Sequence, residues 1–165
     1  MMMTNEKLID FISRFTDHKI DESKIIKSGR NYFYVSSQLK ELKDNIGKDM
    51  FSLGIFVGEE KNEFMPSPGA IDIISKLPGS EKRKIFINKK AEWLFLCGRN
   101  ILEQSVIKNP NNLHEGIVLV QNESDENLGY GIFKQEGKDL IIKHILDKGA
   151  YLRMDEKGRG RRNRR

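Results

Sequence analysis

The apolar residues near the start of the chain recur at helical spacing. Thr4 can cap a helix, and the residues predicted to form its buried stripe are Leu8, Phe11, Ile12 and Phe15. Two apolar runs then flank residues 27–31, where Gly29 can adopt the positive φ of a tight turn. We therefore expect a helix followed by a β-hairpin over residues 25–35.

A second helix and two more strands are predicted downstream of the hairpin. Ser36 or Ser37 can begin the helix and Gly47 can end it, and the residues expected to face inward are Leu39, Leu42 and Ile46. Residues 51–57 and 64–65 have the apolar composition of short strands. Together with the hairpin and the helices, these segments predict a small α/β unit.

A third helix and a short polar connection close the first half of the chain. Ser67 can cap this helix and Pro68 can open it, and the pattern stops at Pro78-Gly79. The connection at residues 78–83 indicates a domain boundary. The expected division is an N-terminal domain at residues 1–79, a second domain at residues 84–156 and a tail at residues 157–165.

The second half of the chain alternates short strands with one short helix. Asn88 can cap a helix over residues 89–97 that Gly98 ends, and Trp93 is expected to pack against the sheet or the domain junction. The predicted strands and apolar strand or turn segments are residues 85–87, 116–120, 128–133, 141–142 and 145–146, with a hairpin loop at residues 121–127. A final strand, led by Gly149, is expected to carry Arg153.

The charge of the chain is unevenly distributed. There are 29 Lys and Arg residues and 24 Asp and Glu residues, which gives a formal net charge of +5. Six of the basic residues and no acid lie in residues 157–165, so residues 1–156 carry a net charge of −1. Affinity for nucleic acid must therefore come from an asymmetric basic face of the folded body, from the tail, or from both.

The tail has no apolar residue that could compensate for the cost of ordering it, so we expect it to be disordered. Guanidinium groups pair with phosphates and stack on bases, which makes an Arg-rich tail suitable for RNA. A solubilising or purely nonspecific terminus is the alternative.

No pattern typical of an enzyme or a metal site occurs in the sequence. The three His residues and the one Cys, Cys97, are scattered, and neither a phosphate-binding loop nor a nucleophile motif is present. We therefore expect a non-catalytic protein without a cofactor or a metal. A single cysteine suits a reducing compartment. The absence of a signal peptide and of an apolar run of membrane length predicts a cytoplasmic protein with no membrane contact.

The second half also contains a recognisable series of patterns. They are a strand at Lys84–Ile87, a helix closed by Gly98-Arg99, a strand after Gly116, the Gly129-Tyr130-Gly131 strand and the Gly149-led segment ending at Arg153. This series resembles a PUA domain, a small RNA-binding barrel. Upstream, Tyr34-Val35-Ser36 and Phe51-Ser52-Leu53-Gly54 resemble the pre-PUA domain of the Nip-seven family of large-ribosomal-subunit biogenesis factors.

The resemblance implies an α+β fold. A small N-terminal α/β pre-PUA domain with a mostly antiparallel sheet would precede a C-terminal PUA-type mixed β-barrel with a short helix. PUA domains hold RNA with the short helix, the segment after it and the final strand. The basic residues on or beside these elements are Lys89, Lys90, Arg99, Lys108, Lys148 and Arg153, to which the tail adds Arg159, Arg161 and Arg162. For each of them a solvated surface charge is the alternative.

The function implied is that of a monomeric assembly factor. It would bind precursor rRNA of the large ribosomal subunit through the PUA surface and the tail. The N-terminal domain carries a net charge of −1 and shows no basic cluster in its sequence, so it would bind other ribosome assembly proteins. A eukaryotic source would place the protein in the nucleolus. Two alternatives stay open: an RNA-binding subunit of an RNA-modification enzyme (a methyltransferase or a pseudouridine synthase), and a protein-binding scaffold with nonspecific RNA affinity.

Overall fold

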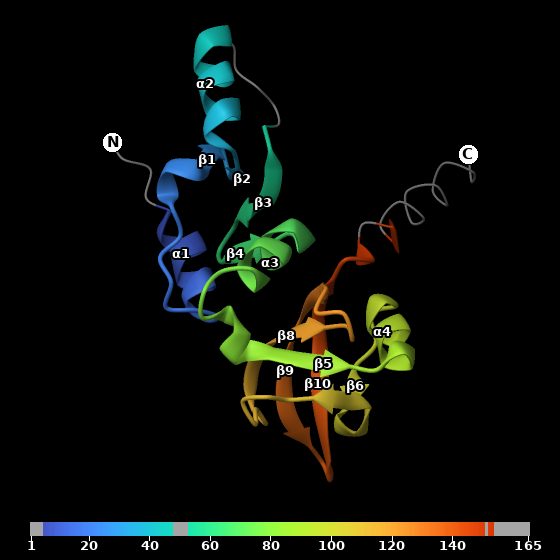
Figure 1. The fold of residues 1–165 in the computed structure, drawn as a ribbon. Helices are drawn as coiled ribbons and strands as arrows, with labels where there is room; N and C mark the ends of the chain where they lie inside the picture. The colour runs from blue at the N-terminus through green and yellow to red at the C-terminus, as the bar shows by residue number, and fades with distance from the viewer. Residues whose placement is uncertain (1–4, 48–52, 151, 154–165) are drawn as a thin grey trace, which may run out of the picture. The chain divides into compact units, whose positions relative to one another are not determined.

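The computed structural model describes residues 5–47, 53–150, 152 and 153. The chain divides into two compact units, Met1–Gly79 and Ser80–Arg165, and each unit has its own sheet (Figure 1). The first sheet is antiparallel and the second is mixed, which confirms the predicted α+β fold class.

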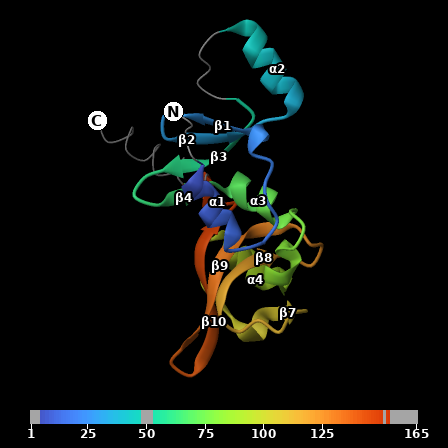
Figure 2. The ribbon, with the colours of Figure 1, turned by 90° about the vertical axis from the view of Figure 1, so that its left-hand side faces the viewer.

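In its described residues, the N-terminal unit has a four-stranded sheet and three α-helices. Its elements are α1 (Glu6–Ser13), β1 (Ile25–Ser28), β2 (Asn31–Tyr34), α2 (Ser37–Ile46), β3 (Ile55–Glu60), β4 (Phe64–Pro66) and α3 (Pro68–Ser75). The strands lie in the order β1-β2-β3-β4, and every neighbouring pair is antiparallel. Helix α3 packs against β3 and β4, and α1 lies near β4 (Figure 2).

The predicted stripe of the first helix is buried. Leu8, Phe11 and Ile12 lie on α1 and Phe15 follows it, and none of the four is more than 4% exposed. The ring of Phe11 packs 5.4 Å from that of Phe64 on β4, measured between centroids. Thr4 lies outside the described residues, and Asn5 occupies the N-cap position. The stripe therefore ties α1 to the sheet.

The predicted hairpin is present as β1 and β2. The two strands pair from Ile25 opposite Tyr34 to Ser28 opposite Asn31, which leaves a two-residue turn at Gly29 and Arg30. Gly29 has a φ of 59°, the left-handed conformation that glycine adopts without steric cost. The third strand is shifted from the expected residues 51–57, because β3 runs from Ile55 to Glu60; residues 51 and 52 lie outside the described part.

The second helix has the predicted ends but not the predicted burial. The side chain of Ser36 accepts a hydrogen bond from the amide of Leu39, and Gly47 ends the helix with a φ of 64°. However, Leu42 is 51% exposed and Ile46 is 45% exposed, and α2 contains no buried residue. The expectation that these two residues face inward was wrong, because apolar spacing identifies a stripe on a helix but not what covers it.

The C-terminal unit is a barrel-like mixed sheet with the helix α4 packed against it. Its elements are β5 (Lys84–Ile87), α4 (Lys89–Leu96), β6 (Ile101–Leu102), β7 (Val106–Lys108), β8 (Gly116–Gln121), β9 (Asn127–Glu136) and β10 (Asp139–Asp147). The strands lie in the order β6-β10-β9-β8-β5-β7, and only the pairing of β5 with β8 is parallel. A short 3-10 turn, Glu103–Ser105, joins the two outer strands β6 and β7, so the sheet is nearly closed.

The core of this unit lies between α4 and the sheet. Ala91 and Phe95, one helical turn apart on α4, are at most 1% exposed and pack with Ile85, Val118 and other sheet residues. Gly131 belongs to the predicted Gly-x-Gly strand. A Cβ atom there would lie 2.5 Å from the backbone oxygen of Lys143 on β10. Glycine is therefore required where β9 and β10 approach closely.

The predicted final strand is absent. Strand β10 ends at Asp147, and Ala150, Leu152 and Arg153 are helical, with the amide of Arg153 donating to the carbonyl of Gly149 at 3.2 Å. The cause is local, because the carboxylate of Asp147 accepts a hydrogen bond from the amide of Gly149 at 2.6 Å. A side chain that caps an amide two residues ahead favours a turn over a continuing strand.

Candidate nucleic-acid interface

Helix α4 presents two lysines to solvent at its first two positions. The side chain of Asn88 caps the helix by accepting a hydrogen bond from the amide of Ala91 at 2.9 Å. Lys89 and Lys90 follow the cap and are exposed, and the Lys89 ammonium lies 3.0 Å from Glu92. Positive charge is unfavourable near the partial positive charge of a helix N-terminus. The two lysines therefore lie where the helix dipole disfavours their charge, and Lys89 is compensated only by its pairing with Glu92.

Trp93 lies on the outer face of the same helix, and this position differs from the prediction. Its side chain is 66% exposed, whereas Ala91 and Phe95 are buried against the sheet. Trp93 stands two positions from each of them. Since successive residues of an α-helix turn by about 100°, it points to nearly the opposite side. The spacing of Ala91 and Phe95 was the signal in the sequence that could have placed Trp93 outside.

The C-terminal end of α4 is closed by glycine and followed by an exposed arginine. Gly98 has a φ of 80°, its amide donates to the carbonyl of Phe95, and the amide of Arg99 donates to the carbonyl of Leu94. This is the pattern of a Schellman helix end, which favours glycine. Arg99 is exposed immediately after it, so the structure places this predicted site residue at the C-terminal end of α4.

Arg153 also lies at this end of α4, but its charge is paired. Its guanidinium contacts the carboxylate of Asp147 at 3.0 and 2.5 Å and donates to the carbonyl of Leu96. Asp147 is fully buried, and the pairing raises the pKa of Arg153. The sequence predicted an exposed residue in a strand. The structure instead shows an arginine that links the last helical turn, β10 and α4.

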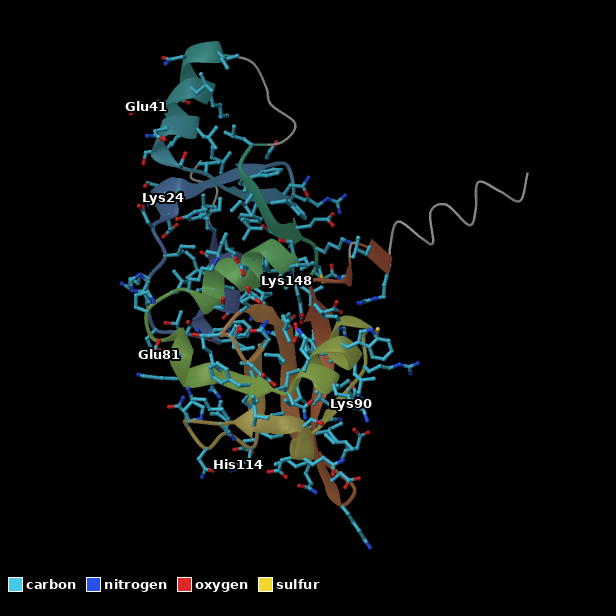
Figure 3. All side chains as sticks on the ribbon, turned by 45° about the vertical axis from the view of Figure 1, so that its right-hand side comes forward. Lys24, Glu41, Glu81, Lys90, His114 and Lys148 are labelled. Atoms are coloured by element: carbon cyan, nitrogen blue, oxygen red, sulfur yellow. The ribbon has the colours of Figure 1, made fainter. Side chains whose placement is uncertain are left out.

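The remaining basic residues of the predicted site fall in three places. Lys148 is exposed next to Asp147, and Figure 3 marks it together with Lys90 on α4. Lys108 lies on the edge strand β7, with its ammonium 5.0 Å from the ring centroid of Phe86, and so belongs to a different element. The three tail residues of the predicted site, Arg159, Arg161 and Arg162, lie outside the described residues.

The N-terminal unit contains a charged cluster that the sequence did not reveal. Glu60 accepts hydrogen bonds from the ammonium of Lys27 at 2.6 Å and the hydroxyl of buried Tyr32 at 2.5 Å, and Lys7 lies 3.5 Å away. These bonds, that from Lys27 first, lower the pKa of Glu60 to about 2. A depression of about 520 Å³ beside Glu60 is also lined by Arg30 and Lys61. Basic residues distant in sequence therefore do gather in this unit.

Within residues 5–47, 53–150, 152 and 153, no group of three or more His, Cys, Asp or Glu side chains could hold a metal ion. Among the same residues, no helix is long and apolar enough to cross a membrane.

Comparison with known proteins places a family match on the C-terminal unit. Residues 83–156 match the family model of the UPF0113 PUA domain. A UPF0113 protein of Archaeoglobus fulgidus is 29% identical over 82 residues, which cover 45% of this chain and 47% of that protein. A tRNA-guanine(15) transglycosylase of Methanocaldococcus jannaschii is 29% identical over 125 residues, which cover 75% of this chain and 18% of the enzyme. The chain thus spans under half of either relative.

Two solved structures are similar to this one over most of the chain. A conserved PUA domain protein from Thermoplasma acidophilum has a TM-score of 0.48 and 13% identity, covering 85% of this chain and 87% of that one. A protein from Pyrococcus horikoshii has a TM-score of 0.47 and 16% identity, covering 91% of this chain and 96% of that one.

Proposed function

We propose that this protein binds RNA through the outer face of α4 and the segments at its C-terminal end. The observation that carries the proposal is the pair of exposed lysines, Lys89 and Lys90, at helix positions where the helix dipole disfavours positive charge. They lie within the segment that matches the UPF0113 PUA domain. Arg99, Lys148 and the arginines of the tail would add phosphate contacts, which supply affinity independent of sequence.

Arg153 has a different part in this proposal. Asp147 neutralises its charge, and its bond to the Leu96 carbonyl joins the last described turn to α4. It would therefore act as a positioning residue that fixes the end of the RNA-binding helix. Lys108, on β7, would contribute only if RNA extended beyond α4.

The finer proposal is a non-catalytic factor in the assembly of the large ribosomal subunit. The resemblance to the Nip-seven family supports it, and precursor rRNA would then be the RNA bound. The N-terminal unit would bind other assembly proteins, and the protein would act as a monomer in the cytoplasm, or in the nucleolus of a eukaryote.

One observation favours a second candidate. The similarity to the tRNA-guanine(15) transglycosylase extends over 75% of this chain, more than the PUA segment alone. A chain of this kind could deliver tRNA to a modification enzyme while carrying no catalytic group of its own. The two candidates share the α4 surface and differ in the RNA they hold.

Binding measurements on a pair of matched variants test the surface. Lys89→Gln combined with Lys90→Gln should weaken binding to RNA and reduce the slope of log affinity against log salt by about 1.4 to 1.8, at about 0.7 to 0.9 per phosphate contact. The control combines Lys134→Gln with Lys138→Gln near the turn between β9 and β10, where the charge removed is the same. Equal losses in the two variants would mean that α4 is not the binding surface.

Crosslinking in cells, followed by sequencing of the attached RNA, tests the finer proposal. Precursor rRNA of the large subunit is the expected result. Recovery of tRNA would favour the second candidate. An absence of RNA would leave the protein-binding scaffold as the better interpretation.

A further inference from the structure

Trp93 is the one tryptophan of the chain and one of its most exposed apolar side chains. Tryptophan side chains usually bury a large area, because the indole ring carries much apolar surface. Here the core beneath α4 is completed by Ala91 and Phe95 instead. The exposed indole therefore has no part in packing the helix onto the sheet.

The surroundings of the ring are basic. Lys90 precedes Trp93 by three residues and Lys89 by four, so both lie one turn away on the same side of α4. The acid between them, Glu92, has a side chain that is only 15% exposed and is paired with Lys89. Among the described residues, neither another ring nor a cation lies over the indole. Its face is available to a planar ligand.

We propose that Trp93 stacks on an unpaired RNA base while the neighbouring cations hold the adjoining phosphates. This inference rests on the proposed function and narrows its ligand to single-stranded or loop RNA. Lys90 precedes Trp93 on the helix by roughly 5 Å, by the rise of 1.5 Å per residue, whereas Arg99 follows the end of α4, beyond Gly98. The backbone of one strand can therefore be held before and after a stacked base.

An A-form duplex does not fit this arrangement. Its bases are stacked on one another, and its deep, narrow major groove cannot be read by side chains, whereas unpaired bases can be splayed onto aromatic rings. Stacking on a single ring tolerates any base, because every base has a π face. The site thus selects unpaired RNA by its structure and not by its sequence.

The fluorescence of Trp93 reports on this site alone, since the chain contains no other tryptophan. Titration of the full chain with a short single-stranded RNA should quench it. The same strand in a duplex, or a strand of equal length without bases, should leave it nearly unchanged. Equal quenching by all three ligands would overturn the proposal, because phosphate contact alone would then explain the signal.

A substitution series separates stacking from charge. Trp93→Leu should weaken binding to labelled single-stranded RNA by about 5- to 150-fold, which is the range for one base stacked on an aromatic ring. Trp93→Phe should retain most of the affinity. The melting temperature should stay within a few degrees in both variants, because the side chain is exposed.

The possible failures can be told apart. If Trp93→Leu binds as tightly as the parent while the Lys89 and Lys90 double variant binds weakly, the stacking inference falls and the proposed function stands. An exposed indole that RNA does not use would then belong to a protein contact. If neither variant loses affinity, the proposed function fails as well.

Discussion

The guanidinium of Arg153 makes a two-point contact with the buried carboxylate of Asp147, with nitrogen-to-oxygen distances of 3.0 and 2.5 Å. The same carboxylate lies 2.5 Å from the ring nitrogen Nε2 of His144 and accepts from the amide of Gly149. A buried carboxylate is tolerated when such partners surround it. The end of β10, the last described turn and α4 therefore share one polar anchor.

Loss of Arg153 should destabilise the C-terminal unit. Arg153→Met leaves the charge of Asp147 without its main partner, and the free energy of unfolding should fall by roughly 3 kcal/mol. Arg99→Met removes an exposed arginine between α4 and β6, and should change the free energy of unfolding by less than about 0.5 kcal/mol. Denaturant unfolding of the two variants would check this. Equal stability would show that the ion pair contributes little to the fold.

Removal of residues 157–165 should weaken RNA binding without unfolding the protein. Six positive charges leave and no apolar residue is lost. The slope of log affinity against log salt should fall by about 0.7 for each tail contact with a single strand. Binding at two salt concentrations measures the slope. If it does not change, the tail makes no contact with RNA.

The loss of stability of the N-terminal unit at low pH should depend on Glu60. Its pKa is about 2 in the folded chain against an ordinary 4.5, chiefly because of the hydrogen bond from Lys27. The ionised form is therefore favoured by folding. The contribution of ionised Glu60 to the free energy of unfolding is complete above about pH 5 and is lost as the pH falls toward 2.

Glu60→Gln should lower stability at neutral pH and flatten its decline between pH 5 and pH 2, as followed by circular dichroism. Glu63→Gln is the matched control, because Glu63 is exposed on the same hairpin. A Glu60→Gln profile parallel to that of the parent would exclude the carboxylate as a source of acid sensitivity.

Gly131→Ala should cost about 3 kcal/mol, because the added methyl group meets the backbone of Lys143 and two paired strands must separate to admit it. Gly137→Ala, at the turn between the same strands, should cost about 1 kcal/mol, since its φ of 62° is strained but the space is open. Thermal unfolding compares the two. The reverse order would contradict the close approach of β9 and β10.

The parts of the fold that depend on neighbours in sequence could be predicted. Ser36, Ser67 and Asn88 all cap their helices through side-chain oxygens, and Gly29 and Gly98 take the expected left-handed conformation. These signals are local. Each capping side chain accepts a hydrogen bond from an amide three residues ahead, and each glycine occupies a position whose backbone angle favours glycine.

The directions of side chains could not be predicted in the same way. Leu42 on α2 is exposed because of what the sheet covers, and the sequence of a helix does not state this. For Trp93 on α4, only its spacing from Ala91 and Phe95 indicated an outward direction. The role of Arg153 was also hidden, since Asp147 is six residues away and the pairing depends on a turn at Gly149. For the candidate site, the sequence could name the cations on α4 but neither the indole beside them nor the ion pair.

The anchor at Asp147 also sets where the basic tail begins. Arg153 is bound to the carbonyl of Leu96, so the twelve residues that follow it are attached next to the C-terminal end of α4. Two contacts joined in one chain raise the effective concentration of the second contact to the millimolar range, and the combined affinity can exceed that of either contact alone by roughly 10²- to 10⁴-fold. The same tail peptide supplied separately would have to be present at millimolar levels to have the same effect.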